Sequence, residues 1–354
     1  MLFFRFISYY YLGDIMKKLL IVFFLFLFFP INCFAVSDTA HNSVVMDIGS
    51  GRVLYSKNMH EKKLIASITK IMTCIIVLEN SNLTDTVKVG EEVLKMYGTN
   101  IYLEIGEEIT VKDLLYGLML RSGNDAAIVL ATSVAGSEEK FVQMMNDKAS
   151  ELGMKNTSFE NSHGLDEESM NYSTAYDMAL LSKYAYKNKI YRKIINTKKY
   201  VTKSNLKSYI WYNRMSLLGT YEYCIGGKNG YTPKAGKTLV SVSKKDNFIL
   251  TTVTLDDSNL YENHKNLYNN IFNKYSNYNV VSKNNFKLSS YFIDNDVYIK
   301  KSFYYPLSTD EINNIYTFFK FDTNKKNKKV GEILILLDNN EIGKVNVYKK
   351  NKKK

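Results

Sequence analysis

Cysteine and histidine are scarce in this chain of 354 residues, which contains three cysteines and four histidines. A disulfide framework needs more cysteines than these, so we expect Cys74 and Cys224 to be buried free thiols. The histidines and cysteines form no cluster with the spacing of zinc ligands, and the sequence predicts neither a zinc site nor a cofactor. Zinc-knuckle spacings and RNA-binding aromatic motifs are also missing. Their absence argues against a nucleic-acid-binding protein despite a formal charge of +12.

The positive charge is compatible with a different kind of partner. The basic residues are dispersed or gathered at the C-terminus, and a basic exterior suits an anionic membrane or cell wall. The abundance of Lys, Asn, Tyr and Ile is also typical of an AT-rich genome, which raises the lysine content without a functional reason. A hydrophobic content of 45% and a charged content of 23% indicate a globular protein, long enough for more than one domain.

The N-terminus has the pattern of a secretory signal peptide. Met16-Lys17-Lys18 is followed by an apolar run over 19–29 and then by a cleavage site after Ala35. We therefore predict a leader over 1–35, with translation starting at Met16, and an exported protein at the outer face of the membrane, in the wall or secreted. The apolar run is short for a transmembrane span, and an uncleaved anchor is the alternative.

The hydrophobic pattern predicts helices between two groups of strands. Segments from both ends of the region would then form one sheet covered by helices. Beyond 275, short strands and asparagine- and lysine-rich turns predict a small β domain over 276–354 with a basic tail, after a main domain over 36–275. The expected elements are a strand pair within 41–55, helices at 67–79, 111–135 (broken at 121–124), 138–152, 174–185 and 260–275, and strands at 237–244 and 248–255.

Ser67 and Lys70 lie three residues apart at the start of an apolar helical pattern. Positions i and i+3 share one face of a helix, so the lysine can take the serine proton and activate the hydroxyl as a nucleophile. On its own the pair is more typical of a helix N-cap followed by a surface lysine. The same spacing recurs at three pairs that we expect on the surface, namely Ser137/Lys140, Ser204/Lys207 and Ser241/Lys244.

Two further motifs follow Ser67 in a suggestive order. Ser122-Gly123-Asn124 lies in the break between helical stretches, and Lys228-Asn229-Gly230 begins a strand. Together the three resemble the S-x-x-K, S-x-N and K-T-G motifs of penicillin-recognising serine acyltransferases. The surrounding residues are closest to the low-molecular-mass D-alanyl-D-alanine carboxypeptidases, over 66–73, 119–127, 163–166, 172–179 and 230–236.

The resemblance covers about 40–275 and implies an α/β (α+β) fold. The main domain would be β-lactamase/transpeptidase-like, with an antiparallel sheet and helices on both faces, followed by the small all-β domain. Ser67 would attack the carbonyl between two D-alanines, and a neutral Lys70 would act as the base. Burial and the nearby charge of Lys228 would lower the pKa of Lys70.

The resemblance also implies the roles of the remaining site residues. Ser122 would relay a proton to the leaving amine, and Asn124 would hold the substrate amide or orient Lys70. Backbone N–H groups of Ser67 and Tyr231 would form the oxyanion hole beside Gly230. Lys228 would attract the terminal carboxylate of the substrate.

This chain departs from the family pattern at Asn229, where the family has Thr or Ser. An asparagine N–H can also donate to a carboxylate, but from a longer arm, so we expect retained activity with altered affinity. Asn171 stands where the family has histidine. Lys237-Thr238 is a decoy for the third motif, since Leu239 follows in place of glycine. We expect a structural role for His163, because it lies far from the three motifs.

These patterns predict an exported serine D-alanyl-D-alanine carboxypeptidase that trims peptidoglycan stem pentapeptides and is acylated by β-lactams. A β-lactamase or a D,D-endopeptidase on the same fold is an alternative, although no general base for rapid deacylation is evident. A catalytically weak wall-binding protein is another, motivated by Asn229. The end of the chain, 348–354, offers no apolar face for insertion. It predicts release or a loose electrostatic contact with anionic membrane or wall polymer.

Overall fold

The structure is a computed structural model that describes residues 37–288, 297–322 and 328–350. The predicted leader, with its cleavage site after Ala35, lies outside the described residues. No helix in the described part of the chain is long and apolar enough to span a membrane.

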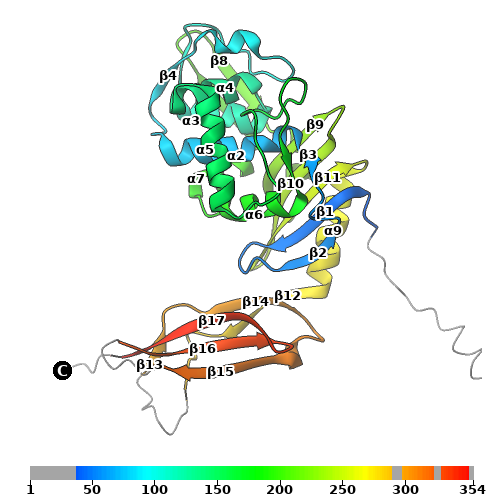
Figure 1. The fold of residues 1–354 in the computed structure, drawn as a ribbon, viewed down its shortest axis with the longest axis vertical. Helices are drawn as coiled ribbons and strands as arrows, with labels where there is room; N and C mark the ends of the chain where they lie inside the picture. The colour runs from blue at the N-terminus through cyan, green and yellow to red at the C-terminus, as the bar shows by residue number, and fades with distance from the viewer. Residues whose placement is uncertain (1–36, 289–296, 323–327, 351–354) are drawn as a thin grey trace, which may run out of the picture. The chain divides into compact units, whose positions relative to one another are not determined.

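A five-stranded sheet joins the start of the described chain to the segment before residue 260 (Figure 1). Its strand order is β2-β1-β11-β10-β9, and every neighbouring pair is antiparallel. The pairing of Val44 with Val253 shows how far apart in sequence the central strands are. The prediction of one sheet assembled from distant segments is therefore confirmed. The strands are β1 (Ala40–Asp47), β2 (Val53–Lys57), β9 (Cys224–Thr232), β10 (Gly236–Lys245) and β11 (Phe248–Asp257).

Helices cover both faces of this sheet. On one face Ser241 of β10 bonds to His264 of α9, and on the other Thr251 of β11 bonds to Ser182 of α6. These contacts confirm the expected layers of helix, sheet and helix. The helices are α2 (Lys70–Asn80), α3 (Val111–Tyr116), α4 (Asn124–Ala135), α5 (Glu138–Glu151), α6 (Ala175–Ala185), α7 (Lys189–Asn196), α8 (Leu217–Thr220) and α9 (Leu260–Lys274).

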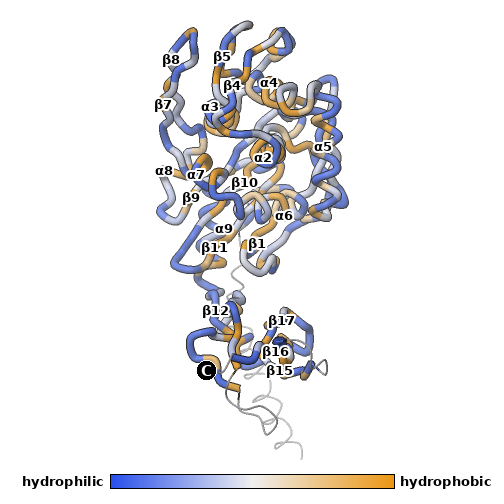
Figure 2. Tube along the Cα trace, turned by 90° about the vertical axis from the view of Figure 1, so that its left-hand side faces the viewer, coloured by the Kyte–Doolittle hydropathy of each residue, from blue (hydrophilic) through white to orange (hydrophobic). Residues whose placement is uncertain are grey.

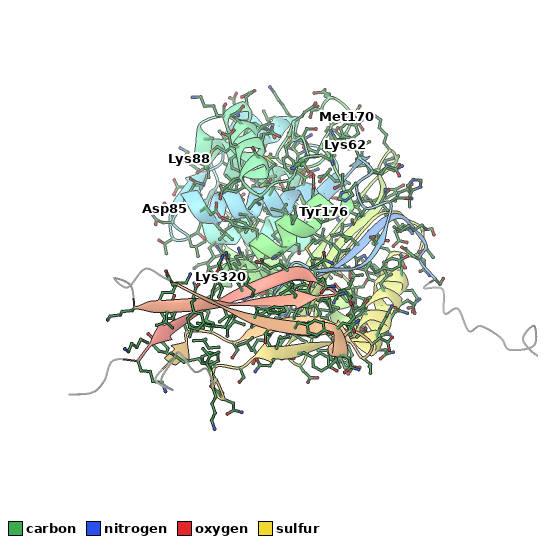
Figure 3. The ribbon with its side chains drawn as sticks, turned by 60° about the horizontal axis from the view of Figure 1, so that its bottom comes forward. Lys62, Asp85, Lys88, Met170, Tyr176 and Lys320 are labelled. Atoms are coloured by element: carbon green, nitrogen blue, oxygen red, sulfur yellow. The ribbon has the colours of Figure 1, made fainter. Side chains whose placement is uncertain are left out.

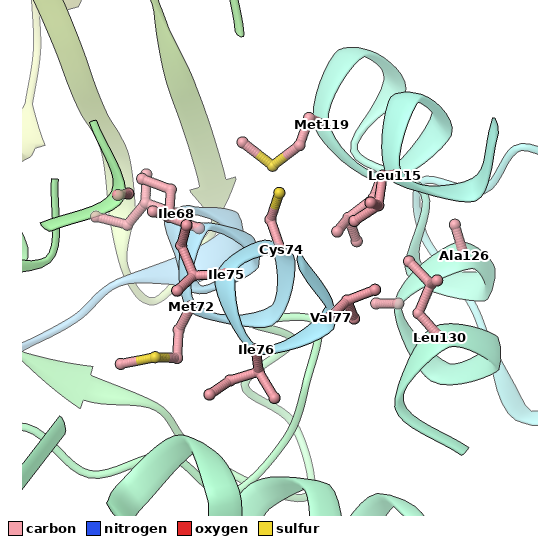
Figure 4. Close-up of a cluster of buried hydrophobic side chains, with 14 of the residues drawn as sticks. Ile68, Met72, Cys74, Ile75, Ile76, Val77, Leu115, Met119, Ala126 and Leu130 are labelled. Carbon is pink, nitrogen blue, oxygen red and sulfur yellow. The ribbon is translucent and has the colours of Figure 1, made fainter. Parts of the chain in front are cut away.

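The helix α2 runs through the hydrophobic core. Its residues from Lys70 to Val77 are buried, and much of its length is hydrophobic (Figure 2). Cys74 and Val77 face Leu115 and Leu130 of the neighbouring helices (Figure 4). A helix buried on all sides has no freedom to shift, so the residues at its N-terminus are held in place.

The expected helix over 67–79 begins later than predicted. Ala66–Thr69 form a 3₁₀ turn, and the α-helix starts at Lys70. Ala66 has a positive φ of 50°, which turns the chain sharply into this segment. Ser67 therefore lies in the tight turn before the helix.

The predicted break in 111–135 is confirmed. After α3, the residues Gly117–Arg121 form a π-helical turn, and Ser122 has the left-handed conformation with φ 66°. The helix α4 then begins at Asn124. A non-glycine residue in this region costs on the order of 1–3 kcal/mol, and such strain is concentrated at functional sites.

Short elements that the hydrophobic pattern did not predict complete the main part of the chain. The hairpin of β7 (Lys199–Lys203) and β8 (Ser208–Tyr212) is held by the stacking of Tyr200 between Tyr116 and Trp211. The helix α7 starts where the side chain of Asn188 caps its first turn. The other short strands pair as β3 (Lys63–Leu64) with β6 (Tyr172–Ser173) and β4 (Thr86–Lys88) with β5 (Glu108–Thr110).

From Tyr275 onward the described chain is built of strands and one 3₁₀ turn, Ile312–Asn314. These strands enclose a separate small core that includes Ile299, Ile335 and Val347. The predicted small β region is thus present, while the domain boundary at 275/276 stays a prediction. A two-stranded sheet pairs β12 (Tyr275–Val281) with β14 (Phe303–Ser308), and a four-stranded sheet has the order β13 (Val297–Ile299), β17 (Asn340–Lys349), β16 (Lys329–Leu337), β15 (Ile315–Phe321).

Candidate active site

The amine of Lys70 lies at the centre of the candidate site. Its Nζ is 3.0 Å from Ser67 Oγ, 2.7 Å from Asn124 Oδ1 and 2.5 Å from the carbonyl oxygen of His163. Lys70 is fully buried at the first position of α2, and Asn124 is the first residue of α4. Two helix starts and one loop therefore hold this amine against the serine hydroxyl.

Burial and a nearby charge favour the neutral form of the Lys70 amine. Burial lowers the pKa of Lys70 well below its usual value, and the ammonium of Lys228 lowers it further, against a smaller opposite effect of Asp125. A neutral amine keeps two N–H bonds, which Asn124 Oδ1 and the His163 carbonyl accept. Its lone pair is then directed at the proton of Ser67.

Asn124 is oriented at both ends of its amide. Its Oδ1 accepts from Lys70, and its Nδ2 donates to the carbonyl oxygen of Tyr97 at 2.7 Å. The neighbouring Asp125 accepts hydrogen bonds from the backbone N–H groups of Ile101 and Leu103. These bonds fix the loop before residue 104 over the start of α4, with Ser122 buried in the strained turn just ahead.

The strand β9 passes very close to the Ser67 turn. A Cβ added to Gly230 would lie 2.7 Å from the backbone nitrogen of Ser67 and 2.7 Å from Thr238 Oγ1. Real Cβ atoms do not approach so closely, so glycine is needed at this position. Because β9 is the edge strand of its sheet, its outer edge is available to an extended substrate backbone.

Lys228 is buried on the same side of β9. Its Nζ donates to the carbonyl oxygen of Asn229 at 2.5 Å, and burial together with the charge of Arg214 lowers its pKa to about 7. Near neutral pH this lysine therefore carries a charge for only part of the time.

Asn229 and Tyr231 alternate to the other side of β9, as successive strand residues do. They line a cavity of about 400 Å³ together with Lys237 of β10 and Tyr261 of α9. Tyr231 is 65% exposed, and Lys237 Nζ donates to the carbonyl oxygen of Ser258 at 3.3 Å. The sequence pattern marked Lys237 only as a decoy, but in the fold its ammonium shares a pocket with Asn229.

The decoy itself has a structural role. Thr238 is fully buried, and its Oγ1 donates to the carbonyl oxygen of Ile65 at 3.0 Å. It thereby ties β10 to the turn that carries Ser67.

The expectation that His163 lies far from the motifs is wrong. Its carbonyl oxygen contacts Lys70, because the loop folds back onto the Ser67 turn, where a Cβ on Gly164 would lie 2.1 Å from the Ala66 oxygen. Burial is the main cause that lowers the pKa of the His163 ring, to about 3, so the ring is neutral. The ring faces Glu138 at 3.8 Å, and only the main chain of His163 touches the amine.

Asn171, where the resemblance implies a histidine, supports the same turn. It is buried, and its Nδ2 donates to Thr69 Oγ1 at 3.0 Å and to the carbonyl oxygen of Asn161 at 3.0 Å. Asn171 therefore connects the loop before His163 to the residue adjacent to Lys70.

Of the three other Ser-x-x-Lys pairs, one contradicts the surface expectation. Ser241 is fully buried and bonds to His264 and Tyr268, because β10 is a central strand covered by α9. Ser137 caps α5, and Ser204 closes the β7–β8 turn.

Arg214 was not found by motif. It lies between β8 and α8, and its Nη1 donates to Thr99 Oγ1 at 3.2 Å. Its positive charge lowers the pKa of Lys228. No spacing marks this arginine in the sequence, because its neighbours at the site come from distant segments.

The two cysteines of the main region are free and buried, as expected. In the described part of the chain, no group of three or more His, Cys, Asp or Glu side chains could hold a metal ion.

Two similar proteins of known name are both D-alanyl-D-alanine carboxypeptidases. D-alanyl-D-alanine carboxypeptidase DacF of Bacillus subtilis is 41% identical over 220 residues, which are 60% of this chain and 56% of that protein. D-alanyl-D-alanine carboxypeptidase DacC of Escherichia coli is 37% identical over 251 residues, or 66% of this chain and 62% of the relative. The alignments thus span about three fifths of the length of these relatives.

Solved structures extend the similarity over more of the chain. Penicillin binding protein 5 from Haemophilus influenzae matches with a TM-score of 0.74 at 25% identity, covering 89% of this chain and 97% of that one. The D-alanyl-D-alanine carboxypeptidase DacD from Francisella tularensis matches with a TM-score of 0.68 at 26% identity, covering 92% and 98%. The predicted fold class, a transpeptidase-like main region followed by a small all-β region, is thereby confirmed.

The family model for D-alanyl-D-alanine carboxypeptidases matches residues 34–259, a range that contains Ser67, Lys70, Asn124 and Lys228. This chain therefore belongs to the D-alanyl-D-alanine carboxypeptidase family, peptidase family S11.

Proposed function

We propose that this protein is a serine D-alanyl-D-alanine carboxypeptidase that removes the terminal D-alanine from peptidoglycan stem pentapeptides. The observation that carries the proposal is the 3.0 Å contact of the Lys70 amine with Ser67 Oγ, together with the burial that lowers the pKa of this amine. A serine hydroxyl becomes a nucleophile when an adjacent base takes its proton, and this pair has the required reach.

In the first step Ser67 Oγ attacks the carbonyl carbon of the penultimate D-alanine, and its proton passes to Lys70 Nζ. The developing oxyanion accepts hydrogen bonds from the backbone N–H groups of Ser67 and Tyr231. The C–N bond then breaks, and Ser122 passes the proton from Lys70 to the departing amine. D-Alanine leaves, and water hydrolyses the acyl ester on Ser67 with Lys70 again taking a proton.

The terminal carboxylate of the substrate needs donors near β9. Lys228 is buried and only partly charged near pH 7, so we assign it mainly to setting the pKa of Lys70. The Asn229 amide and the Lys237 ammonium line one pocket, and both can donate to a carboxylate that crosses the edge of β9. Gly230 keeps that edge open to the substrate backbone, and Asn124 donates to the substrate when its bond to Tyr97 is exchanged.

The test uses a fluorescent penicillin and a peptide that ends in D-Ala-D-Ala. We expect wild type to be labelled covalently and to release D-alanine, and Ser67→Ala to do neither while keeping the same melting temperature. Ser137→Ala, at another Ser-x-x-Lys pair, is the matched control and should behave as wild type. Labelling that persists in Ser67→Ala would place the nucleophile elsewhere.

Asn229 supports a second candidate, a wall-binding protein with weak catalysis. Asparagine reaches further than the threonine or serine of the family, and a poorly held carboxylate would slow acylation by peptide more than acylation by a strained β-lactam. Penicillin labelling without D-alanine release in the same assay would favour this candidate.

We also propose that the protein is exported and acts on the outer face of the membrane or in the wall, consistent with its cell-wall-related relatives. N-terminal sequencing of the protein recovered from the cell surface should begin at Val36. A sequence beginning at Met16 would instead indicate an uncleaved anchor.

A further inference from the structure

The outer face of the C-terminal four-stranded sheet exposes a group of large apolar side chains. Tyr316 and Phe318 of β15 are 52% and 57% exposed. In the antiparallel register they stand opposite Leu336 and Leu334 of β16, which are half-buried. Residues directly opposite in such a pair share one face. We call these four residues, Tyr316, Phe318, Leu334 and Leu336, the outer patch.

The opposite face of the same strands is occupied by the core of this region. Ile333 and Ile335 alternate with the leucines of the outer patch and pack with Ile299 and Val347. The outer patch therefore lies outside the hydrophobic core, because the opposite face of the sheet is the one that packs against it. Soluble proteins rarely leave contiguous apolar side chains of this size exposed without a partner.

Lysines border the outer patch. Lys344 of β17 is opposite Leu334, and Lys320 of β15 follows Phe318 at the next position on the same face. Figure 3 labels Lys320 on this sheet. Glu332 lies among three lysines, Lys329, Lys320 and Lys344, which lower its pKa. It forms an ion pair with Lys329 at 3.1 Å. The other acidic residue on these strands is Glu341, opposite Leu336.

Positive charge also dominates the wider region. Residues 276–354 contain fifteen lysines against eight aspartates and glutamates. At one side of the sheet the ammonium of Lys300 sits 4.5 Å from the ring centre of Tyr348. Aromatic side chains flanked by lysines are the composition that binds at the boundary between lipid headgroups and acyl chains.

We propose that this face binds the surface of an anionic lipid bilayer, with the outer patch inserted among the acyl chains near the headgroups and Lys320 and Lys344 contacting lipid phosphates. The contact is amphipathic, and it goes beyond the purely electrostatic contact that the basic tail predicts. It is independent of the chemistry at Ser67.

Charge and polarity favour lipid over two other occupants. A second copy of the chain on the same face would bring the lysines of both copies together, which is unfavourable. An anionic wall polymer would engage the lysines but would leave Phe318 and Tyr316 in water. Only a surface that is both anionic and apolar a few ångströms below matches the two features at once.

The experiment is vesicle co-sedimentation of the chain from Val36 onward. We expect binding to phosphatidylglycerol vesicles and little binding to phosphatidylcholine vesicles. Phe318→Ser should weaken the binding about tenfold, because it removes a large apolar side chain from the lipid. Lys344→Glu should weaken it at least about fivefold, since each lysine near an anionic surface contributes about that factor.

Matched controls carry the same changes outside the outer patch. Tyr304→Ser alters an exposed aromatic residue of β14, and Lys88→Glu reverses an exposed lysine of β4. Both should bind vesicles as wild type does, and all variants should keep the wild-type melting temperature and D-alanine release.

Equal binding by wild type and Phe318→Ser would overturn the proposal. So would binding to a soluble polyanion with no binding to phosphatidylglycerol vesicles. A concentration-dependent dimer in sedimentation, lost in Phe318→Ser without any vesicle binding, would assign the face to a second copy and would equally refute the lipid contact.

Discussion

Among the individual residues, two buried lysines have lowered pKa values, and the proposed chemistry depends on their protonation. Three oxygens surround Lys70 Nζ, those of Ser67, Asn124 and the His163 carbonyl, and burial lowers the pKa of the amine and so favours its neutral state. Lys228 stabilises that neutral state by repulsion, and Arg214 acts on Lys228 in the same way. The charge of Lys228 thus lowers the pKa of Lys70, and Arg214 influences how much of that charge is present near pH 7.

The pH dependence of acylation tests whether Lys228 lowers the pKa of Lys70. Acylation by a penicillin should fall on acidification as Lys70 takes up a proton, with a midpoint well below the usual lysine pKa. In Lys228→Met the repulsion is gone, so the pKa of Lys70 rises and the midpoint should move to higher pH. Lys237→Met, which removes a lysine on the other side of β9, should leave the midpoint in place. Equal midpoints in wild type and Lys228→Met would refute the coupling.

Stability should show the cost of burying Lys228. Its pKa is about 7 in the folded protein and near 10.5 in the unfolded chain, so the unfolded chain binds more protons between these values. The contribution of this group therefore increases the free energy of unfolding as pH rises from about 7 to 10.5. Lys228→Met should be more stable than wild type at pH 7, by a few kcal/mol at about 1.4 kcal/mol per pKa unit. In urea titrations the difference should shrink toward pH 10, and a constant difference would contradict the assignment.

Asn229 allows a test of substrate affinity. Asn229→Thr introduces the family residue, whose shorter side chain places a hydroxyl close to the strand. We expect a higher kcat/KM for a D-Ala-D-Ala peptide, by about three- to tenfold, which corresponds to one neutral hydrogen bond. The rate of penicillin acylation should change less. A fall in kcat/KM would mean that asparagine is the better donor in this pocket.

At the scale of the element, the site depends on the close approach of β9 to the 3₁₀ turn. Gly230 and Gly164 bring backbone from two other segments against residues 66–67, where a Cβ would collide with main-chain atoms. The turn is thereby held between a strand and a loop, and Lys70 begins a helix that is buried on all sides. Preorganised backbone donors of this kind need no rearrangement during the reaction.

Gly230→Ala should separate the strand from the turn. Its methyl group would lie 2.7 Å from the Ser67 nitrogen, so β9 must shift and the oxyanion donors lose their spacing. We expect the acylation rate to fall by about two orders of magnitude, the usual effect of losing one such donor. Gly219→Ala, where a Cβ meets nothing within 4 Å, is the control and should acylate normally. A Gly230→Ala enzyme with wild-type rates would show that the approach is not needed.

At the scale of the whole molecule, no disulfide connects the described segments, and their association depends on the hydrophobic core and the central strand pairs. Cys74 is fully buried in α2, and burial raises its pKa far above the usual range. Cys224 is buried at the start of β9, and its pKa is raised to about 11. Both thiols are therefore unreactive in the folded state.

Thiol titration tests whether both cysteines are free and unreactive in the folded protein. In the chain from Val36 onward, a chromogenic disulfide reagent should react with two thiols after unfolding and with almost none before. A reducing agent should leave the melting temperature unchanged. A fall of several degrees under reduction would reveal a disulfide and contradict the free thiols.

Much of the fold could be predicted because its signals are local. The helical periods of 138–152 and 174–185 and the strand patterns of 237–244 and 248–255 correspond closely to α5, α6, β10 and β11. The short elements β7, β8 and α7 escaped because they are held by distant contacts, such as the stacking of Tyr116 on Tyr200. The late start of α2 was missed for the same reason, since the loop at Gly164 shapes the turn before it.

The Ser67–Lys70 pair, the order of the three motifs and the family resemblance can all be read from the sequence, because three-residue spacing brings side chains together within a single turn of chain. Only the packed fold brings about the lowered pKa of Lys70, the contact of the His163 carbonyl with its amine, the approach of Arg214 to Lys228 and the face of β9 on which Asn229 lies. It also turned Ser241 from an expected surface residue into a buried one. Burial and repulsion between residues far apart in the chain depend on which segments pack together, and no local spacing records that.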